Sequence, residues 1–472
     1  MTTRRTKIVT TLGPATDGEG VLLALVRAGA DVVRINFSHG LAADHERRIK
    51  AVREAAAALG RDVGVLADLQ GPKIRIESFR DGPVELKEGA LFALDTSLAK
   101  DAGDVTQVGC AYKPLPDDTG EGDVLLLNDG AIAMRVDKVR GTRVECTVTQ
   151  GGILSNRKGI NKQGGGLSAA ALTDEDRRNI QYAAEWEADF LAVSFPRTAA
   201  DMHEARRLVQ QSGGHALLVA KIERAEALTN LAEIVAASDA VMVARGDLGV
   251  EIGDAELPGW QKRIISAARE ANKMVITATQ MMESMITNPI PTRAEVMDVA
   301  NAVMDGSDAV MLSAETASGK YPVKVVEAMA RVVVGAEAHP MPDVVTNDSH
   351  FRRIDEAVAM ATAWTARRMN AQALVALTES GSTALMMSRV ERLAPIFAMT
   401  RHERTRRRMT LCRGVIPVAF DPVNLDGGTV KEALARLKVL HLVRAGDRVL
   451  VTKGDYDGTG GGTNTLKILT VE

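Results

Sequence analysis

Three charged residues in the middle of the chain have the types and the spacing of a cation site beside an anionic substrate. Lys221 and Glu223 end one short apolar run, and Asp247 ends the next run, after a helical stretch. If the two runs are neighbouring parallel strands, both carboxylates lie at the same end of one sheet. A lysine beside two carboxylates suits a divalent cation bound next to a charged substrate. A single Lys-x-Glu at a strand end is more often a surface ion pair, so the prediction depends on the repeats around it.

Short apolar runs of the kind that form buried parallel strands occur eight times. They begin at Lys7, Asp31, Val63, Phe190, Leu217, Ala240, Met274 and Ala309. Helical stretches rich in Ala, Glu and Arg separate most of them. Eight strand-helix units predict an α/β fold built on a (β/α)8 TIM barrel, whose active site lies at the carboxyl ends of the strands. A doubly wound open sheet is the alternative, but it would not need functional residues from so many strand ends.

Polar residues end these otherwise apolar runs, which is hard to explain by packing. They are Arg34, Asn36, Ser38, Asp68, Lys221, Glu223, Asp247, Thr279, Gln280, Ser313 and Glu315. In a closed barrel all of them would face one rim.

Two regions depart from the alternating pattern. Between Asp68 and Phe190 the chain is rich in Gly, Asp, Val and Thr, which predicts a small all-β domain inserted after the third strand. Because only two short connections would join this domain to the barrel, we expect it to act as a lid over the rim. The segment that leads back to the barrel is followed by a helix that starts at 173–175. After a linker near residue 340, a third, α/β domain follows. The predicted division is 1–70 and 166–340 for the barrel, 71–165 for the inserted β-barrel lid and 341–472 for the C-terminal domain.

The composition excludes several classes of partner. The chain has 472 residues, of which 46% are hydrophobic, and a net charge of −3, which predicts neither nucleic acid nor a membrane surface. No apolar run reaches the roughly 18 residues of a membrane span, and the basic N-terminus lacks the apolar core of a signal peptide. Cys110, Cys146 and Cys412 lie far apart, which fits a reducing cytoplasm and gives no metal-ligand spacing.

Seven stretches along nearly the whole chain resemble the pyruvate kinase family, in the family's order. They are TLGPAT, RINFSHG, LVAKIERAEAL, MVARGDLGVE, TATQMMESM, PTRAEVMDVANAVMDGSDAVMLSAETASGKYP and LTESGSTA. The resemblance implies a phosphotransferase that moves the phosphoryl group of phosphoenolpyruvate to ADP, giving pyruvate and ATP, with Mg2+ or Mn2+ as cofactor. It also implies a cytoplasmic homotetramer with a phosphorylated allosteric effector. As in bacterial members, we expect no helical segment before the first strand.

The resemblance assigns roles to the residues at the rim. Glu223 and Asp247 match the divalent-metal ligands, and Mg2+ needs few protein oxygens when substrate and water supply the rest. Lys221 matches the lysine that stabilises the transferring phosphoryl group, and Arg34 matches a phosphate-contacting arginine. Backbone amides at Gly246 and Asp247, where a helix begins, match the site of the substrate carboxylate.

Further roles follow from the same resemblance. Thr279 and Ser313 match the hydroxyl residues near the face at which the enol carbon is protonated. Since a hydroxyl is a poor acid, we expect a hydroxyl-water relay; helix capping is the alternative for either residue. Contacts to the nucleotide are implied for Asn36, His39, Arg75 and Lys158.

The chain departs from the family pattern near its predicted lid joint. Many members need K+, held at the pocket of Asn36, Ser38, Asp68 and Leu69, and those members have a glutamate where this chain has Lys73. The ammonium of Lys73 could replace the charge of the ion. Leu69, Gln70 and Ile76 also differ from the K+-using pattern. We therefore expect that K+ is not required; drift in a solvated hinge is the alternative.

The C-terminal domain contains a candidate anion site. The loop of Thr378, Glu379, Ser380, Gly381, Ser382 and Thr383 matches the family's effector-phosphate loop, where amides and hydroxyls meet at a helix start. The effector could be a sugar phosphate or a nucleotide, with Lys453 and residues 458–462 closing over it. The basic stretch RHERTRRRMTLCR is interpreted as a solvated helix face or a subunit contact rather than a phosphate clamp. In the inserted domain, Asn128-Asp129-Gly130 is a candidate hairpin turn.

Two other functions are kept open. One is a lyase or mutase that uses Mg2+ with pyruvate or an enolate on the same barrel, which would not need Arg75, Lys158 or a lid. The other is a non-catalytic sugar-phosphate sensor with an inactive barrel. The complete set of Lys221, Glu223 and Asp247 argues against the sensor.

Overall fold

The computed structural model describes residues 4–339, 351, 353–390, 393–423, 428–455 and 462–472. The predicted linker near residue 340 and most of the glycine-rich loop at 458–462 lie outside these residues.

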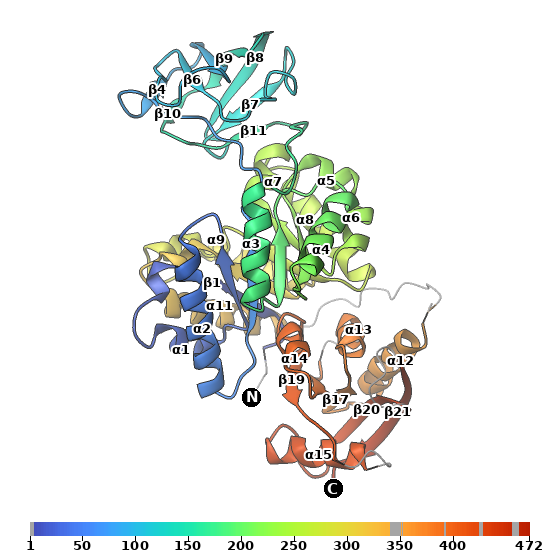
Figure 1. Ribbon diagram of the computed structural model, residues 1–472. Coiled ribbons are helices and arrows are strands. Elements are labelled where there is room, and N and C mark those ends of the chain that lie inside the picture. Colours follow the sequence, from blue (N-terminus) through green and yellow to red (C-terminus); the bar gives the residue numbers. More distant parts are fainter. Residues whose placement is uncertain (1–3, 340–350, 352, 391–392, 424–427, 456–461) are drawn as a thin grey trace.

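The eight apolar runs form one closed parallel barrel (Figure 1). Its strands are β1 (Lys7–Thr11), β2 (Val32–Asn36), β3 (Gly64–Asp68), β12 (Phe190–Val193), β13 (Leu217–Ile222), β14 (Ala240–Ala244), β15 (Met274–Ala278) and β16 (Ala309–Leu312). Each strand pairs with its neighbours in the chain order, and β1 closes on β16 with Lys7 opposite Ala309. The predicted TIM barrel is therefore confirmed, and the open sheet is excluded.

Helices surround the barrel and cover the apolar outer side of its strands. They are α1 (Val21–Ala28), α2 (Ala42–Ala58), α3 (Asp174–Glu185), α4 (Ala199–Gln211), α5 (Ala225–Thr229), α6 (Leu231–Ala237), α7 (Arg245–Ile252), α8 (Leu257–Glu270), α9 (Arg293–Met304), α10 (Ala314–Ala317) and α11 (Pro322–Glu337), with 3-10 turns η1 (Pro14–Thr16) and η2 (Glu283–Ile286). The helix predicted at 173–175 begins where expected. Thr173 caps α3, because its Oγ1 accepts a hydrogen bond from the Asp176 amide while the Asp176 carboxylate accepts one from the Thr173 amide.

The segment between β3 and α3 is the predicted all-β insertion. Its strands are β4 (Val84–Leu86), β5 (Leu91–Asp95), β6 (Gln107–Gly109), β7 (Val124–Leu127), β8 (Ile132–Arg140), β9 (Arg143–Gln150), β10 (Gly152–Leu154) and β11 (Ile160–Lys162). Six of them pair in the order β11-β7-β8-β9-β5-β6, and β10 pairs with β4. The hairpin turn predicted at 128–130 is confirmed, because these residues join β7 to β8 with positive φ angles of 54°, 55° and 85°.

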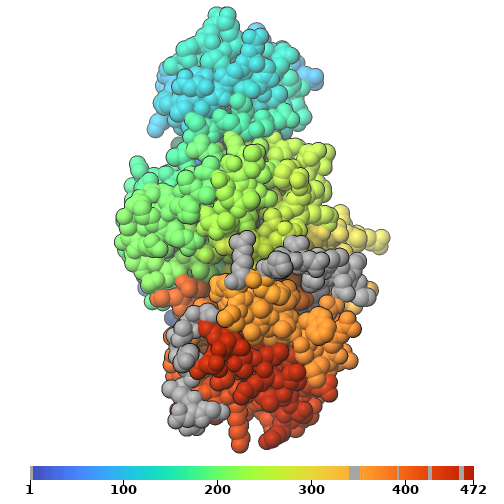
Figure 2. All heavy atoms as spheres, turned by 90° about the vertical axis from the view of Figure 1, so that its right-hand side faces the viewer, coloured from blue at the N-terminus to red at the C-terminus, as the bar shows by residue number. Residues whose placement is uncertain are grey.

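The C-terminal domain is the predicted α/β unit. A sheet in the order β19-β18-β17-β20-β21 contains β17 (Ala373–Leu377), β18 (Ile396–Thr400), β19 (Val415–Ala419), β20 (Arg448–Gly454) and β21 (Thr463–Thr470). Its helices are α12 (Ile354–Met369), α13 (Ser382–Val390), α14 (Glu403–Met409) and α15 (Thr429–Val439). Only β21 of these strands is antiparallel to its neighbour. In Figure 2 the three parts are stacked, with the insertion at one end and this domain at the other.

Helix α14 corrects one expectation from the sequence. Arg406, Arg407 and Arg408 do not form a solvated face, because they bind the barrel, whereas Arg404 is exposed. Arg407 is buried and its Nε donates to Asp189 Oδ1 at 2.8 Å, while Arg406 Nε lies 3.2 Å from Asp62 Oδ2. The basic stretch therefore holds the C-terminal domain against the amino ends of the barrel strands.

Two further features of the described chain bear on the class of protein. None of its helices has the length and the apolar character of a membrane span. Cys110, Cys146 and Cys412 are buried free thiols, and burial raises the pKa of each, to about 11, about 12 and about 11.

Candidate active site

The ammonium group of Lys221 lies at the centre of the strand-end rim, among three oxygen atoms. Its Nζ is 2.9 Å from Glu223 Oε1 and 3.2 Å from Asp68 Oδ1. The third oxygen is Ser194 Oγ, which accepts a hydrogen bond of 2.6 Å from Nζ. These groups come from β3, β12 and β13 or the residues just beyond them, which are consecutive strands of the barrel. The sheet, rather than the local sequence, brings them together.

Burial and charge shift the pKa values of this cluster in different directions. Burial by itself would lower the pKa of Lys221, but the carboxylates of Asp68 and Glu223 outweigh it and raise that pKa. For Glu223, burial outweighs the attraction of Lys221, and with the Asp247 carboxylate it raises the pKa to about 7. Burial also opposes ionisation of Asp68, but Lys221 and Arg34 outweigh it and lower the pKa of Asp68. Glu223 is therefore a buried rim carboxylate for which the single positive charge of Lys221 does not offset burial and the Asp247 carboxylate.

Arg34 extends the cluster toward β1. Its Nε donates to Asp68 Oδ2 at 2.6 Å, and its Nη1 donates to Thr11 Oγ1 at 3.1 Å. Both side chains of the Arg34–Asp68 pair are almost fully buried. A guanidinium held in this way is preorganised to meet a phosphate group without losing further side-chain entropy.

The start of α7 faces Thr279, which follows β15. The Gly246 amide donates to Thr279 Oγ1 at 2.9 Å, and this hydroxyl donates to the carbonyl of Ala278 at 2.6 Å. Thr279 and Gln280 have left-handed φ angles of 68° and 54°, which are costly for residues with side chains. Arg245 stabilises this turn.

The contacts of Arg245 were not predicted from the sequence. Its Nε donates to the Thr279 carbonyl at 3.2 Å, and its Nη1 donates to both carboxylate oxygens of Asp298, at 2.7 and 2.8 Å. The Arg-Gly-Asp sequence after β14 marks Arg245 as a candidate, but nothing in the sequence indicates that its partner lies on α9.

Ser313 lies at the end of β16 and is joined to the same turn through Glu315. The Glu315 carboxylate accepts from the Ser313 amide at 2.6 Å and from the Met282 amide at 3.2 Å. Ser313 Oγ is buried and has no hydrogen-bond partner among the described residues. A buried hydroxyl without a partner suits a site that takes up water or substrate.

The residues expected on the nucleotide side lie at the joints of the insertion. Arg75 forms a β-bridge with Gly159, and the Ile76 amide donates to the Lys158 carbonyl at 2.9 Å, so Arg75 and Lys158 are close across the two joints. Burial lowers the pKa of His39, and the charges of Lys73, Arg34 and Arg75 lower it further. His39 therefore lies in the same basic region.

The pocket expected for K+ is present in part. Asn36 Oδ1 accepts a hydrogen bond of 3.1 Å from the Ser38 amide, and Asp68 already binds Arg34 and Lys221. The carbonyl of Leu69 accepts a hydrogen bond of 2.7 Å from Ser194 Oγ. Lys73 lines the narrow cleft at the joints together with Asp247 and other residues of both domains.

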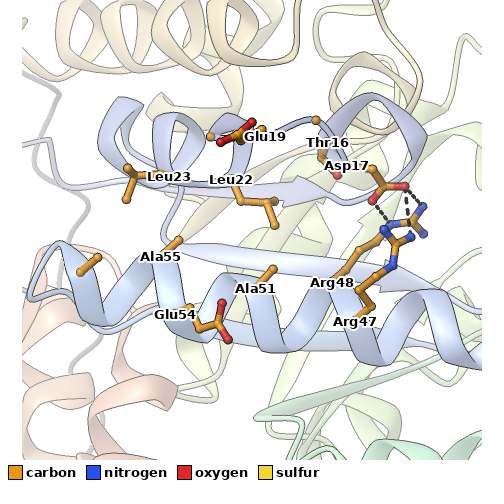
Figure 3. Close-up of a pocket in the computed structure, with 13 residues that line it drawn as sticks. Thr16, Asp17, Glu19, Leu22, Leu23, Arg47, Arg48, Ala51, Glu54 and Ala55 are labelled. Carbon is orange, nitrogen blue, oxygen red and sulfur yellow. Dashed lines mark hydrogen bonds and ion pairs between the residues drawn. The ribbon is translucent and has the colours of Figure 1, made fainter.

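A larger cavity, of about 420 Å3, lies on the outside of the barrel between η1, α1 and α2 (Figure 3). Its charged end is already neutralised, because Asp17 accepts two hydrogen bonds of 2.7 Å from Arg48. Leucine and alanine side chains line part of the rest, together with Glu19 and Glu54, as Figure 3 shows. The cavity lies apart from the cluster of Lys221, Glu223 and Asp68 at the rim.

The predicted effector loop has the geometry of a helix start in the C-terminal domain. Gly381 has a φ of 85° and its amide donates to Thr378 Oγ1 at 2.9 Å, directly before α13. A Cβ at Gly381 would lie 2.5 Å from Met409 Sδ, so this position requires glycine. Glu379 in the same loop forms an ion pair with Arg401 and a hydrogen bond with His402.

Known proteins share both the sequence and the fold. The family models for the pyruvate kinase barrel domain and the pyruvate kinase alpha/beta domain match residues 3–326 and 356–469. The chain is 55% identical to Pyruvate kinase II of Salmonella typhimurium and 51% identical to the pyruvate kinase of Haemophilus influenzae, each match covering 99% of both chains. The chain belongs to the pyruvate kinase family.

A solved structure supports the same conclusion for the architecture. A pyruvate kinase from Cryptosporidium parvum matches with a TM-score of 0.91 at 33% identity, over 99% of this chain and 96% of that chain. The enzyme is thus a phosphotransferase of glycolysis that converts phosphoenolpyruvate and ADP to pyruvate and ATP. The lyase or mutase and the non-catalytic sensor are thereby excluded.

Within this pyruvate kinase, the structure gathers the sequence-predicted residues into three groups. Arg34, Asp68, Lys221 and Glu223 share direct contacts, Gly246 and Thr279 share a hydrogen bond, and Arg75 and Lys158 meet at the joints. The sequence reasoning did not single out Ser194, Arg245 or Asp298. The first has no motif of its own, and the latter two act through contacts between distant segments.

Proposed function

We propose that phosphoryl transfer takes place at the rim around Lys221. The observation that carries the proposal is the position of this ammonium group between Glu223 and Asp68, in a buried cluster at the carboxyl ends of the strands. A lysine charge held in a site from which water is excluded acts strongly on a phosphoryl group whose equatorial oxygens carry the transition-state charge.

Glu223 and Asp247 would hold Mg2+, or Mn2+ in its place. Glu223 is 2% exposed, and burial together with the Asp247 carboxylate raises its pKa to about 7 even though Lys221 lies beside it. A further positive charge at this position would stabilise the ionised carboxylate. Among the described residues no group of three or more His, Cys, Asp or Glu side chains forms a complete metal cage. Two carboxylates fit Mg2+, which keeps several ligand positions for water and phosphate oxygens. When bound, the cation would neutralise charge on the phosphoryl and enolate oxygens.

Phosphoenolpyruvate would bind across the rim. Arg34 and Lys221 would contact its phosphoryl group, while the amides of Gly246 and Asp247 at the start of α7 would hold its carboxylate. The Gly246 amide now donates to Thr279 Oγ1, so the carboxylate would replace that hydroxyl as its acceptor. The exchange would free Thr279 Oγ1 for the reacting enolate.

Protonation of the enolate would use Thr279 and Ser313. The unpartnered hydroxyl of Ser313 and the neighbouring turn of Thr279 are connected through the contacts of Glu315. A relay of these hydroxyls and water would deliver the proton, because a threonine or serine hydroxyl is too weak an acid to supply it alone.

ADP would lie between the barrel and the insertion. Asn36, His39, Arg75 and Lys158 are the proposed contacts. Positive charge gathers near His39, since the charges of Lys73, Arg34 and Arg75 add to the effect of burial in lowering its pKa. The bridge between Arg75 and Gly159 brings the returning joint, which contains Lys158, to the same place. Closure of the insertion over the rim would exclude water from the transfer.

The direct test of the metal site is a coupled assay of ATP formation at graded Mg2+ concentrations. Glu223→Gln and Asp247→Asn should each raise the Mg2+ concentration for half-maximal rate by at least about tenfold and lower the maximal rate, since each removes a charged ligand. Asp189→Asn, which removes a buried carboxylate at the other end of the barrel, is the control and should keep the wild-type Mg2+ dependence. An unchanged Mg2+ response in either rim variant would remove that residue from the metal site.

The enzyme is proposed to work without K+. Asp68 is already paired with Arg34 and Lys221, and Lys73 places a further positive charge at the joint of the insertion. These charges leave little for a monovalent cation to neutralise at Asn36, Ser38, Asp68 and Leu69.

Activity in buffers with Na+ or a large organic cation as the only monovalent species tests this proposal. Full activity is expected there. Lys73→Glu should lower the rate and make it respond to added K+, because the substitution reverses the local charge. A wild-type enzyme that is inactive until K+ is supplied would contradict the proposal.

A phosphorylated effector is proposed to bind at residues 378–383. The loop offers hydroxyls and amides at the start of α13, and Thr383 Oγ1 is hydrogen-bonded at 2.8 Å to Thr463 Oγ1 at the start of β21. Thermal-shift measurements on the full chain with a sugar phosphate and with a nucleoside monophosphate would distinguish the two classes. Ser382→Asp should abolish the shift through charge repulsion, and the absence of a shift with any phosphate would count against the site.

Assembly, location and domain limits complete the proposal. We infer a cytoplasmic homotetramer from the family, and sedimentation velocity of the purified enzyme tests the subunit number. The domain limits 1–70 and 166–340, 71–165, and 341–472 are supported by the separate sheets of the three parts. Limited proteolysis near residues 70, 165 and 340 would test them.

A further inference from the structure

Ser194 occupies an unusual position beside the phosphoryl-transfer lysine. It follows β12, which lies between the strands of Asp68 and Lys221 in the barrel. The residue is 1% exposed, and its Oγ accepts the 2.6 Å hydrogen bond from Lys221 Nζ. Lys221 Nζ lies farther from Asp68 Oδ1, at 3.2 Å, and that oxygen accepts no hydrogen bond from the residues that the structure describes. Ser194 is therefore the closest polar neighbour of the ammonium group.

The direction of the hydrogen bonds of Ser194 is fixed. A serine hydroxyl has one proton to donate, and Ser194 Oγ donates it to the carbonyl of Leu69 at 2.7 Å. Its lone pairs are thus left for Lys221. The hydroxyl cannot serve as an acid toward substrate while this bond persists, so its role is to hold the lysine.

The backbone around Ser194 is held as well. Phe195 has a left-handed φ of 57°, and its amide donates to Glu223 Oε2 at 2.9 Å. Gly71, in the outgoing joint of the insertion, packs so closely that a Cβ there would lie 2.8 Å from Ser194 Cβ. The Gly71 amide donates to Asp176 Oδ1, which ties the joint to the barrel. The turn at Ser194 and Phe195 thus fixes both Lys221 and Glu223.

We propose that Ser194 is a positioning residue for phosphoryl transfer, which orients Lys221 from a fixed point on β12. The proposal rests on the proposed role of Lys221. A bound cation would attract the carboxylates of Glu223 and Asp68 and could draw them away from Lys221. The neutral hydroxyl of Ser194 would keep its contact with Lys221 when a cation or substrate binds. Ser194 holds one ammonium proton, and the other two face Glu223 and Asp68. A cation bound to these carboxylates would weaken their hold on Lys221, so that the two protons could turn to the phosphoryl oxygens while Ser194 keeps the ammonium group in place.

The expected effect is on turnover rather than on affinity. Ser194→Ala keeps the lysine charge but loses its orientation, so kcat should fall about 10-fold to 100-fold, as for other small misplacements of a catalytic group. The KM for phosphoenolpyruvate should change by no more than about twofold, because ground-state binding depends on several other groups. Ser194→Cys, which retains a weak acceptor of similar size, should show an intermediate kcat.

The control is Ser238→Ala. Ser238 is also a 1% exposed serine that donates to a backbone carbonyl, that of Ile234 at 2.7 Å, but it lies at the amino end of β14. Ser194→Ala loses two buried hydrogen bonds and Ser238→Ala loses one, so both thermal midpoints should fall, that of Ser194→Ala somewhat more. Only Ser194→Ala should lower kcat.

A double-mutant cycle with Lys221→Met decides whether Ser194 acts through the lysine. Ser194→Ala should lower kcat in the wild-type background and have no further effect when Lys221 is already methionine. An equal loss in both backgrounds, or wild-type kcat in folded Ser194→Ala, would overturn the proposal. If Lys221→Met alone leaves turnover intact, the role proposed for Lys221 is the part that fails.

Discussion

The two ends of the barrel use buried aspartates, glutamates and basic residues in opposite ways. At the amino ends, an aspartate precedes every second strand, and its carboxylate accepts a hydrogen bond from the second amide of the strand before it. The four aspartates are Asp31, Asp189, Asp239 and Asp308, and their donors are Ile8, Val65, Leu218 and Val275, at 2.8 to 3.0 Å. This repeat joins β1 to β2, β3 to β12, β13 to β14 and β15 to β16.

Each of these aspartates also has an arginine. Arg4 binds Asp31 and Arg206 binds Asp239 from within the barrel, whereas Arg407 and Arg389 reach Asp189 and Asp308 from the C-terminal domain. Burial alone would raise the pKa of Asp308, but Arg389 outweighs it and lowers that pKa. Two of the four acidic positions therefore serve to dock the C-terminal domain.

At the carboxyl ends the charges are not matched in this way. Asp68 and Glu223 share Lys221, and Asp68 also binds Arg34, but burial and the nearby Asp247 carboxylate raise the pKa of Glu223 to about 7. We infer that aspartates with an arginine of their own stabilise the fold, whereas carboxylates that share one lysine leave negative charge for a ligand.

The largest expected effect is a loss of kcat when Lys221 is replaced, compared with replacement of Lys7, a buried lysine at the other end of the barrel. Lys221→Met should lower kcat on the order of 10³-fold with little change in KM, because its charge matters most as the phosphoryl group transfers. Lys7→Met is the matched control, since Lys7 is buried at the opposite end and its Nζ donates to the Val415 carbonyl at 2.7 Å. Steady-state kinetics of both variants should show normal kcat for Lys7→Met. A similar loss of kcat in both variants would contradict the proposal that only the carboxyl ends of the strands take part in catalysis.

The next effect is on stability alone. Asp308→Asn should reduce the free energy of unfolding by about 3 kcal/mol, because it leaves the buried Arg389 without its counter-charge. Asp239→Asn should cost about 1 kcal/mol or less, since that carboxylate is 25% exposed and Arg206 is 34% exposed. Urea unfolding gives the energies, and kcat per folded enzyme should stay at the wild-type value in both variants. A loss of kcat in Asp308→Asn would show that the docking contacts also shape the rim.

The smallest effect concerns pH. Because the folded pKa of Asp308 is lowered, its contribution to stability is present above the ordinary aspartate pKa of about 3.9 and is lost as the pH falls through the folded value. The difference in thermal midpoint between wild type and Asp308→Asn should therefore be constant near neutral pH and narrow below about pH 4. Calorimetry across this range measures it, and a difference that grows on acidification would rule out ionised Asp308 as the source of the stability.

The sequence by itself determined which segments form the barrel strands and at which end of the barrel the site lies. Eight apolar runs became eight strands because residues buried on both faces must be apolar throughout, and the polar residue after each run then had to lie at the rim. Local signals also sufficed where the chemistry is local. Thr173 caps α3 three residues before its partner Asp176, and the turn at 128–130 needs only the backbone freedom of its own residues.

Only the tertiary structure decided which charges meet. The basic residues of α14 look like a solvated surface in the sequence, and their partners Asp62 and Asp189 lie more than two hundred residues away. Likewise, nothing around Ser194 marks it, since a serine after a strand is common and its meaning comes from Lys221 and Leu69 on the neighbouring strands. The physical reason is that hydrophobic periodicity is set by the few residues around each position, whereas burial and electrostatic pairing depend on distances that exist only once the sheet has closed.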